Sequence, residues 1–249
     1  ADGTSEGALT NEDGDAVKAS VNWKGSEGIP VLTFEGVDTS KLAGKDLVAS
    51  LTLYGRTDKD ADWVRLASLN AIDDDDLAVS IPKIDTTLTA ENGLHEVQVS
   101  GDGTVTLKDQ VHYMNATPGH AYILEGILMS RTAEEGKAVG EKAYASFTAE
   151  EAEGTAEVIF TLDASKLSGE TVVAFETLYS DPAADVTDEW ADAFGAGKDA
   201  EFGADTLDDA WIVASHKDLA DEDQAVHFVK LSTELTAVNG LHVMEAPDG

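Results

Sequence analysis

Four polar side chains fall in phase with apolar residues of strand-like segments: Thr86, Glu176, His216 and Gln224. Because successive strand residues point to opposite faces, each of the four shares a face with aliphatic or aromatic neighbours. Hydroxyl, imidazole and carboxyl groups are the ones used in nucleophilic and acid–base chemistry. Each polar group left unpaired in a core would cost about 1–3 kcal/mol. We therefore expect the four to lie together and satisfy one another, unless they sit at the wet ends of their strands.

A conventional hydrolytic site is a second interpretation of the same stretch. Ser215, His216 and Asp221 have the side chains of a Ser/His/Asp triad. However, adjacent strand residues such as Ser215 and His216 point to opposite faces. The sequence also has no nucleophile elbow around Ser215. The pattern therefore gives little support to a hydrolase.

The elements that would position these groups are strands. Short segments rich in Val, Ile, Thr and aromatic residues are bounded by Gly, Asp, Asn or Pro, which predicts strands over 46–54, 110–113, 121–129, 156–162, 171–179, 211–215 and 225–231. Residues 147–154 (FTAEEAEG) predict a turn or one helical turn. The acidic insertion 181–209 carries Trp190 and Phe194 at helical spacing, which favours a short surface helix. The expected fold class is all-β, as Ig-like or β-sandwich modules.

An internal repeat divides the chain into modules. The string LTAxNGLH occurs at 88–95 and again at 235–242, and VDTSKLAG at 37–44 matches LDASKLSG at 162–169. This register predicts the C-terminal part of one repeat over 1–82, a complete repeat over 83–230 and the first strand of a following repeat over 231–249. Such a tandem array favours a stalk over an enzyme.

Composition narrows the possible partners. The net charge is -33, and such a field repels nucleic acid and anionic lipid, so we expect no nucleic-acid partner and no membrane contact by this segment. The absence of cysteine excludes disulfides and thiolate metal sites. No apolar run approaches the ~18 residues of a membrane span.

One motif joins the polar residues named above. The string from His216 to Gln224 (HKDLADEDQ) resembles the H-x4-D-x2-Q ending of the T-Q ester bond domains, also called VaFE repeats, of Gram-positive surface proteins. Residues 173–176 (VAFE) reproduce the V-x-F-E signature. Further matches, in order along the middle repeat, are IDTT at 84–87, KDQVHY at 108–113, TPG at 117–119 and FTAEE at 147–151.

This resemblance implies a self-catalysed crosslink. The hydroxyl of Thr86 would attack the side-chain carboxamide of Gln224, release ammonia and leave an ester. His216 would act as general base and then general acid, because a free threonine hydroxyl is a poor nucleophile. Asp221 and Glu176, with raised pKa values in an apolar pocket, would hold the amide and stabilise the oxyanion. No cofactor or metal is implied, and the reaction is a single intramolecular turnover rather than enzymatic catalysis.

The choice between the two adjacent threonines rests on the repeat. The incipient third repeat keeps a threonine, Thr233, at the position of Thr86 but has Glu234 at the position of Thr87. Thr86 is therefore the expected nucleophile, and Thr87 is a weaker candidate.

The first repeat lacks the residues that the ester requires. Shifts of 125 and 148 positions, with a slip of one, align it with the complete repeat. In the order Glu176, His216, Asp221 and Gln224, the aligned residues are Leu51, Leu69, Asp73 and Asp76. Without the glutamine no Thr–Gln ester can form, so we expect residues 1–82 to be a degenerate repeat.

The resemblance implies a structural stalk module of an adhesin or fibre, extracellular and attached to the cell wall of a Gram-positive bacterium. Its partners would be neighbouring repeats, with any host or cell-surface ligand bound elsewhere in the full protein. Two alternatives stay open. One is an isopeptide-type pilin domain using Lys83 or Lys108, against which the Gln and His positions argue. The other is a calcium-dependent adhesion module using the acidic stretches 11–15, 73–76 and 181–209, none of which has the twelve-residue calcium-loop pattern.

Overall fold

The computed structural model describes residues 7–11, 13–24, 28–39, 41–71, 74–99, 103–132, 136–181, 203–231 and 234–236. Within these ranges the regular structure consists of β-strands and three short 3-10 turns, with no α-helix. The all-β fold class expected from the sequence is confirmed. No helix in the same ranges is long and apolar enough to cross a membrane.

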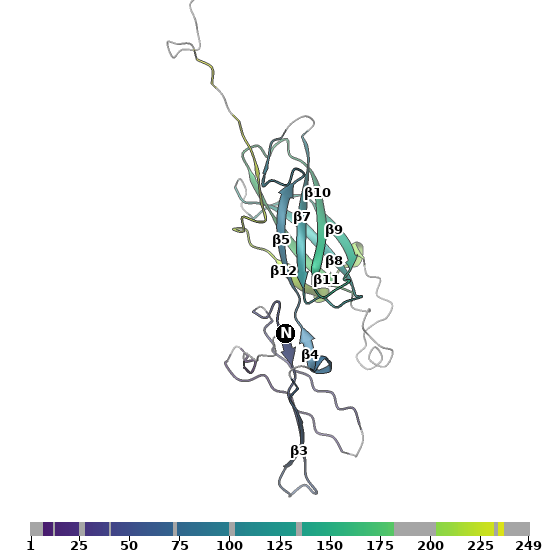
Figure 1. The fold of residues 1–249 in the computed structure, drawn as a ribbon. Helices are drawn as coiled ribbons and strands as arrows, with labels where there is room; N and C mark the ends of the chain where they lie inside the picture. The colour runs from purple at the N-terminus through teal and green to yellow at the C-terminus, as the bar shows by residue number, and fades with distance from the viewer. Residues whose placement is uncertain are drawn as a thin grey trace, which may run out of the picture.

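The middle of the chain forms two β-sheets (Figure 1). The smaller sheet has the strand order β10-β7-β5, and the larger has the order β6-β13-β11-β8-β9, with β12 also paired to β11. The strands are β5 (Lys83–Ala90), β6 (Glu96–Val97), β7 (Thr104–Met114), β8 (Ala121–Ser130), β9 (Ala138–Thr148), β10 (Gly154–Asp163), β11 (Thr171–Ser180), β12 (Ile212–His216) and β13 (Ala225–Phe228). All pairs are antiparallel except β6 with β13.

Two strands share one edge of β11. β13 pairs with its first half, and β12 pairs with its second half, where His216 lies opposite Glu176. The connecting segment 217–224 leaves this edge and returns where the backbone N–H of Ala174 donates to the carbonyl of Gln224 at 3.0 Å. The register therefore brings the end of β12 and the start of β13 together along β11.

The core forms because alternate strand residues point between the sheets. In β7 the buried apolar residues are Val105, Leu107, Val111 and Tyr113. β11 is buried along nearly its whole length, which fits its central place in the larger sheet. Each fully buried aliphatic side chain contributes about 1.5–3 kcal/mol. The two sheets consequently hold any polar group on their inner faces away from water.

The first region repeats part of this pairing. β1 (Asp46–Val48) pairs with β4 (Ala78–Ser80), and β2 (Leu51–Gly55) pairs with β3 (Val64–Leu69). These registers are those of β11 with β13 and with β12, at constant offsets of 125 and 147 residues. The same turn also recurs, since Gly44 and Gly169, at φ 77° and 88°, lie against the stems of Lys83 and Lys230. The structure thus reproduces the internal repeat seen in the sequence.

Several predicted elements differ from the observed ones. The strand expected over 46–54 is divided into β1 and β2, and β9 was not expected. Residues 150–153 form bends, so of the two possibilities expected over 147–154 the turn is observed and the helical turn is not. The predicted helix at Trp190 and Phe194 lies outside the described residues, as does most of the segment 231–249.

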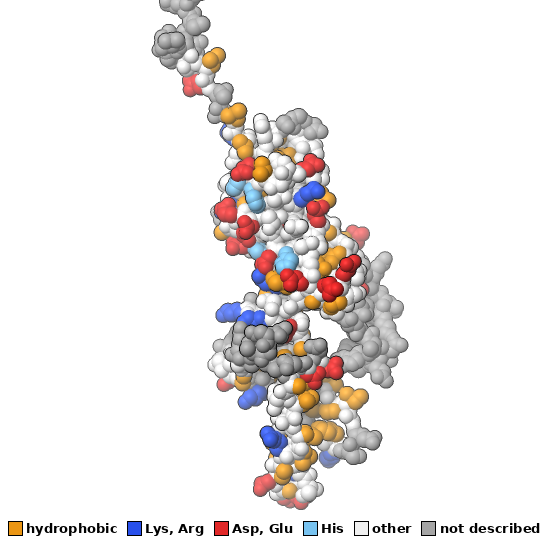
Figure 2. Space-filling view, viewed as in Figure 1, with side chains coloured by type: hydrophobic (Ala, Val, Ile, Leu, Met, Phe, Trp, Pro, Cys, Tyr) orange, Lys and Arg blue, Asp and Glu red, His pale blue; other side chains and the backbone are white. Residues whose placement is uncertain are grey.

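Charge is distributed as the composition suggests. Acidic side chains are spread over the visible face of the molecule, with fewer lysines and arginines between them (Figure 2). Among the described residues, no group of three or more His, Cys, Asp or Glu side chains is arranged to hold a metal ion.

Candidate crosslink site

Thr86 and Gln224 meet in the core. Thr86 lies in β5 of the smaller sheet, and Gln224 immediately precedes β13 of the larger sheet. The Gln224 Nε2 donates a hydrogen bond to Thr86 Oγ1, joining residues 138 positions apart. Thr86 is 6% exposed and Gln224 is fully buried. This contact links the first and last principal strands of the module across the two sheets.

Thr87 lies on the other face of β5. Burial alternates along the strand, so that Ile84, Thr86 and Leu88 are buried whereas Thr87 is exposed. The geometry therefore favours Thr86 as the hydroxyl that faces the glutamine.

Two buried carboxyl groups accompany this pair. Glu176 in β11 and Asp109 in β7 are both fully buried. None of their four carboxyl oxygens accepts a hydrogen bond from the described residues. Two unpaired carboxylates in such a place would be costly, and a proton shared between them would lower that cost. Burial of both groups therefore favours a carboxyl pair that shares a proton.

The pKa shifts agree with this picture. Burial raises the pKa of Glu176 well above its usual value, and the neighbouring Asp109 raises it further. Burial also raises the pKa of Asp109, but interaction with Glu176, the Thr86 hydroxyl and the charge of His216 acts in the opposite direction. Thr86 is thus close enough to Asp109 to influence it, although the two do not form a hydrogen bond of ordinary geometry. The pair retains a proton to higher pH than an exposed carboxyl would.

Asp109 was not among the site residues expected from the sequence. A signal was nevertheless present, because Asp109 is in phase with Val105, Leu107, Val111 and Tyr113 along β7. This is the same anomaly that identified Glu176, namely an acidic residue on an apolar strand face. Asp109 is the second residue of the KDQVHY motif, which supported the family resemblance but was not used to choose site residues.

His216 and Asp221 form a separate pair beside the buried groups. The His216 Nε2 lies 3.0 Å from Asp221 Oδ2, and their side chains are 21% and 25% exposed. His216 is opposite Glu176 in the β11–β12 register. Asp221 was expected to share an apolar pocket with Glu176, but it is partly exposed and contacts the imidazole instead. It lies in a turn before β13, where water still reaches it.

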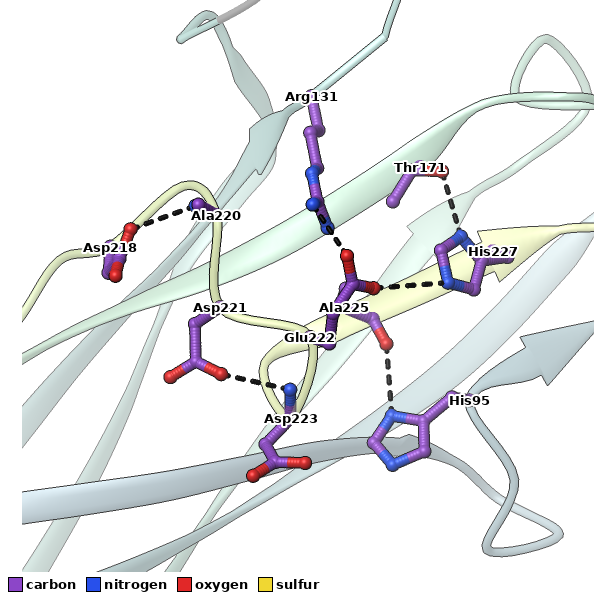
Figure 3. Close-up of polar contacts among 10 residues, drawn as sticks. All are labelled: His95, Arg131, Thr171, Asp218, Ala220, Asp221, Glu222, Asp223, Ala225 and His227. Carbon is purple, nitrogen blue, oxygen red and sulfur yellow. Dashed lines mark hydrogen bonds and ion pairs between the residues drawn. The ribbon is translucent and has the colours of Figure 1, made fainter.

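The loop that carries Asp221 and Gln224 is held in several places (Figure 3). Asp221 Oδ1 accepts from the backbone N–H of Asp223 at 2.9 Å, so this carboxylate binds the loop with one oxygen and His216 with the other. Arg131 Nη2, just after β8, donates to Glu222 Oε1 at 2.6 Å. The pKa of Glu222 is lowered by this guanidinium. These contacts fix the backbone that presents Gln224 to Thr86.

The structure corrects the alignment of the first region. Its offset of 147 residues places Leu77, not Asp76, at the position of Gln224, and Asp74, not Asp73, at that of Asp221. The backbone confirms this offset, because Ala49 N–H donates to the carbonyl of Leu77 as Ala174 does to Gln224. The slip assumed from the sequence is unnecessary, since the turn before β4 has the same length as the turn before β13.

The residues aligned with Glu176 and His216 are the ones expected from the sequence. Leu51 faces Leu69 in the β2–β3 pair, where Glu176 faces His216 in the β11–β12 pair. Three of the four aligned positions in the first region are therefore leucines.

Comparison with known proteins gives one match to a family and several to structures. Two structures of a bacterial adhesin from Mobiluncus mulieris, described as containing intramolecular disulfide, isopeptide and ester bond cross-links, are 16% identical, with TM-scores of 0.44 and 0.42. Each match covers 61% of this chain and 58% of that chain, so the chain spans little more than half of the adhesin's length. A putative beta-galactosidase from Bacteroides fragilis is 14% identical over 56% of this chain and 17% of its own, with a TM-score of 0.33.

Comparison with curated proteins gives no match. The family match is to the T-Q ester bond containing domain, over residues 82–228. It spans more than half of the chain and includes all the residues of the site described above. The chain belongs to the T-Q ester bond domain family.

Proposed function

We propose that residues 83–230 are a structural module of a cell-surface adhesin or fibre, stabilised by an ester between Thr86 and Gln224 that the module forms by itself. The observation that carries this proposal is the buried contact between Gln224 Nε2 and Thr86 Oγ1. The hydroxyl and the carboxamide already touch, in a site that also contains a buried carboxyl pair and an imidazole.

The reaction is an acyl transfer. The Thr86 Oγ–H bond breaks, Oγ bonds to the Gln224 side-chain carbonyl carbon, and the bond from that carbon to Nε2 breaks. The proton from Oγ, passed through the site, converts the departing NH₂ group to ammonia. The products are one ester and one ammonia. Because Gln224 is consumed, the module completes one turnover and is not an enzyme.

Proton transfer is assigned to the groups around the pair. His216, oriented by Asp221, takes the proton from the hydroxyl and returns it to the leaving nitrogen. The negative charge that develops on Gln224 Oε1 needs a donor, since this oxygen is buried and accepts no hydrogen bond from the described residues. The proton held by Glu176 and Asp109 is the donor that we assign to it. General acid–base catalysis of this kind contributes about 10²–10⁴-fold.

Holding the two reacting groups in contact supplies the rest of the rate acceleration. An amide is a poor acyl donor and threonine a poor nucleophile, but the fold holds them in contact. Well-oriented intramolecular reactions reach effective molarities on the order of 10⁵–10⁸ M. Crosslinking therefore needs the folded module and no external catalyst.

The bond would strengthen the module in two ways. It closes a loop between residues 138 positions apart, which by analogy with a disulfide stabilises by about 4–5 kcal/mol. It also joins β5, where the chain enters the module, to β13, where the chain leaves it (Figure 1). Tension along a stalk would pass through the ester and not only through the hydrogen bonds between strands.

This role fits an extracellular protein attached to the cell wall of a Gram-positive bacterium, with neighbouring repeats as partners. The net charge of -33 disfavours nucleic acid and anionic lipid as partners. Any host ligand would bind elsewhere in the full protein.

The test is intact mass followed by peptide mapping. The protein should weigh less than its sequence mass by one ammonia, about 17 Da. A Thr86 peptide should be joined to a Gln224 peptide by a link that hydroxylamine cleaves. Thr86→Ala and Gln224→Ala should fold and retain the full mass. An unmodified wild-type mass would refute the proposal.

The same peptide map distinguishes the ester from an isopeptide bond. A link from Lys83 or Lys108 to asparagine loses the same mass but resists hydroxylamine. Both lysines are about 40% exposed, with acidic partners Asp85 and Glu157. A calcium titration followed by thermal unfolding tests the remaining alternative.

A further inference from the structure

Gly126 lies directly opposite Glu176 in the pairing of β8 with β11. Its φ angle is not in the left-handed region, so the backbone conformation alone does not require glycine. The space beside Gly126, however, leaves no room for a larger side chain. A methyl carbon placed on Gly126 would lie 2.8 Å from both carboxyl oxygens of Glu176 and 2.6 Å from Cζ of Phe160. Such distances are shorter than van der Waals contact, so something would have to move.

The volume that a side chain at position 126 would occupy is therefore filled by Glu176 and Phe160. Phe160, in β10 of the opposite sheet, is 3% exposed and reaches across the core to this position. Its ring and the Glu176 carboxyl converge on the same glycine. The ring is fixed by core packing, whereas the carboxylate is the end of a flexible side chain. An alanine at position 126 would displace the carboxylate more easily than the ring.

We propose that Gly126 is a positioning residue for the crosslinking reaction, because its lack of a side chain allows the Glu176 carboxyl to lie against Asp109 under the Phe160 ring. This inference rests on the proposed function and adds a residue to it. Gly126 does not touch the reacting hydroxyl or carboxamide. It acts through Glu176 by defining where the shared proton can be held.

The first measurement is the rate of crosslinking after cell-free synthesis, from the loss of ammonia over time. Gly126→Ala is expected to slow it about 10²-fold, as a displacement of about 1 Å in a reacting site can do. The matched control is Ala149→Val, which adds bulk at a fully buried alanine in the turn after β9, beside His120. The control should lose stability yet crosslink at the wild-type rate. Wild-type crosslinking by Gly126→Ala would overturn the inference and leave the proposed function intact.

The second measurement does not depend on ester formation. In the Thr86→Ala background, the side-chain carboxyl carbons of Glu176 and Asp109 are followed by NMR as the pH is varied. With Gly126 the two groups should titrate as one coupled pair. With Gly126→Ala they should titrate separately, because the carboxyls no longer contact each other.

Unchanged coupled titration in the alanine variant would refute the positioning role even if the wild-type protein never formed an ester. In that case the proposed function would fail by its own mass measurement, and the role of Gly126 would be judged on the titration alone. If the variant crosslinked slowly but kept the coupled titration, the loss would have another cause and the inference would also be wrong.

Discussion

The complete module and the first region pair their strands in the same register but place different chemistry on it. Glu176 faces His216 across β11 and β12, whereas Leu51 faces Leu69 across β2 and β3. The turn that presents Gln224 in one presents Leu77 in the other. The strand pairing therefore does not depend on the polar residues. This is the pattern expected if they serve the proposed reaction and not the fold.

The difference between the two regions also affects the free energy of folding. In the complete module the carboxyl oxygens of Asp109 and Glu176 and the Oε1 of Gln224 are buried and accept no hydrogen bond from the described residues. Burying such groups costs free energy, whereas a leucine in the same place would contribute it. A module that keeps these polar groups should be less stable before crosslinking, and the proposed ester would then stabilise it by a different means.

The largest expected effect comes from making the complete module resemble the first region. Gln224→Leu should abolish the loss of ammonia and remove the stabilisation of about 4–5 kcal/mol that the closed loop provides. Burial of the new leucine should restore about 1.5–3 kcal/mol of the lost stabilisation. Intact mass and denaturant unfolding measure both effects. Leu77→Gln in the first region is the reciprocal control and should yield no second crosslink, because Leu51 and Leu69 remain. A second lost ammonia there would contradict the comparison.

A smaller effect concerns pH. In the uncrosslinked Thr86→Ala protein, Glu176 and Asp109 have folded-state pKa values raised above their usual values of 4.5 and 3.8. Their contribution to stability is complete below the unfolded pKa values and is lost as the pH rises through the folded ones. The free energy of unfolding should therefore decline as pH is raised from about 4 towards neutrality. Adding Glu176→Gln should flatten this decline, and an equally steep decline would show that the carboxyl pair is not its source.

The next effect acts on the loop before β13. Arg131→Gln removes the ion pair with Glu222 but leaves every reacting group in place. Crosslinking should slow by only a few-fold, since both partners reach solvent and such pairs contribute little. Because Arg131 lowers the pKa of Glu222, the contribution of this pair is present at neutral pH and is lost as pH falls through the folded pKa. Rates compared at neutral and acidic pH would reveal it; equal slowing at every pH would argue for a packing effect.

The smallest effect distinguishes the two threonines. Thr87→Ala should leave the ester intact and change the free energy of unfolding by no more than about 0.5 kcal/mol, because this side chain is exposed. Peptide mapping of this variant should still find Thr86 linked to Gln224. Loss of the link on changing Thr87 would reassign the nucleophile.

The fold could be predicted where strands are short and strongly patterned. Ala121–Ser130 and Thr171–Ser180 were located almost to the residue because their aliphatic residues are continuous. Ala138–Thr148 was missed because Ala, Gly and Ser give little hydrophobic contrast even where they alternate. The division of 46–54 into two strands could not be predicted, since the residues at the break, Ala49 and Ser50, are neither glycine nor proline.

The site was predictable where a polar residue interrupts an apolar face. Thr86, Glu176 and Gln224 were expected on that basis and are buried together. Asp109 gave the same signal and was overlooked. Asp221 could not be placed from periodicity, because it lies in a turn whose path depends on contacts such as that of Arg131 with Glu222. The four consecutive aspartates at 73–76 fit the turn in two registers, which explains why Asp76 was aligned in place of Leu77.

The positions of Thr86 and Gln224 near the ends of the module would also limit its extensibility once the proposed ester forms. Thr86 is the fourth residue of β5, and Gln224 immediately precedes β13. The chain between them spans 138 positions, which at about 3.3–3.6 Å per residue is on the order of 450–500 Å of contour length. An ester withholds all of it from extension, even if every strand pair inside the loop were broken. A pulled wild-type module should therefore lengthen only by the few residues outside the link, whereas Gln224→Ala should release the full length in one step.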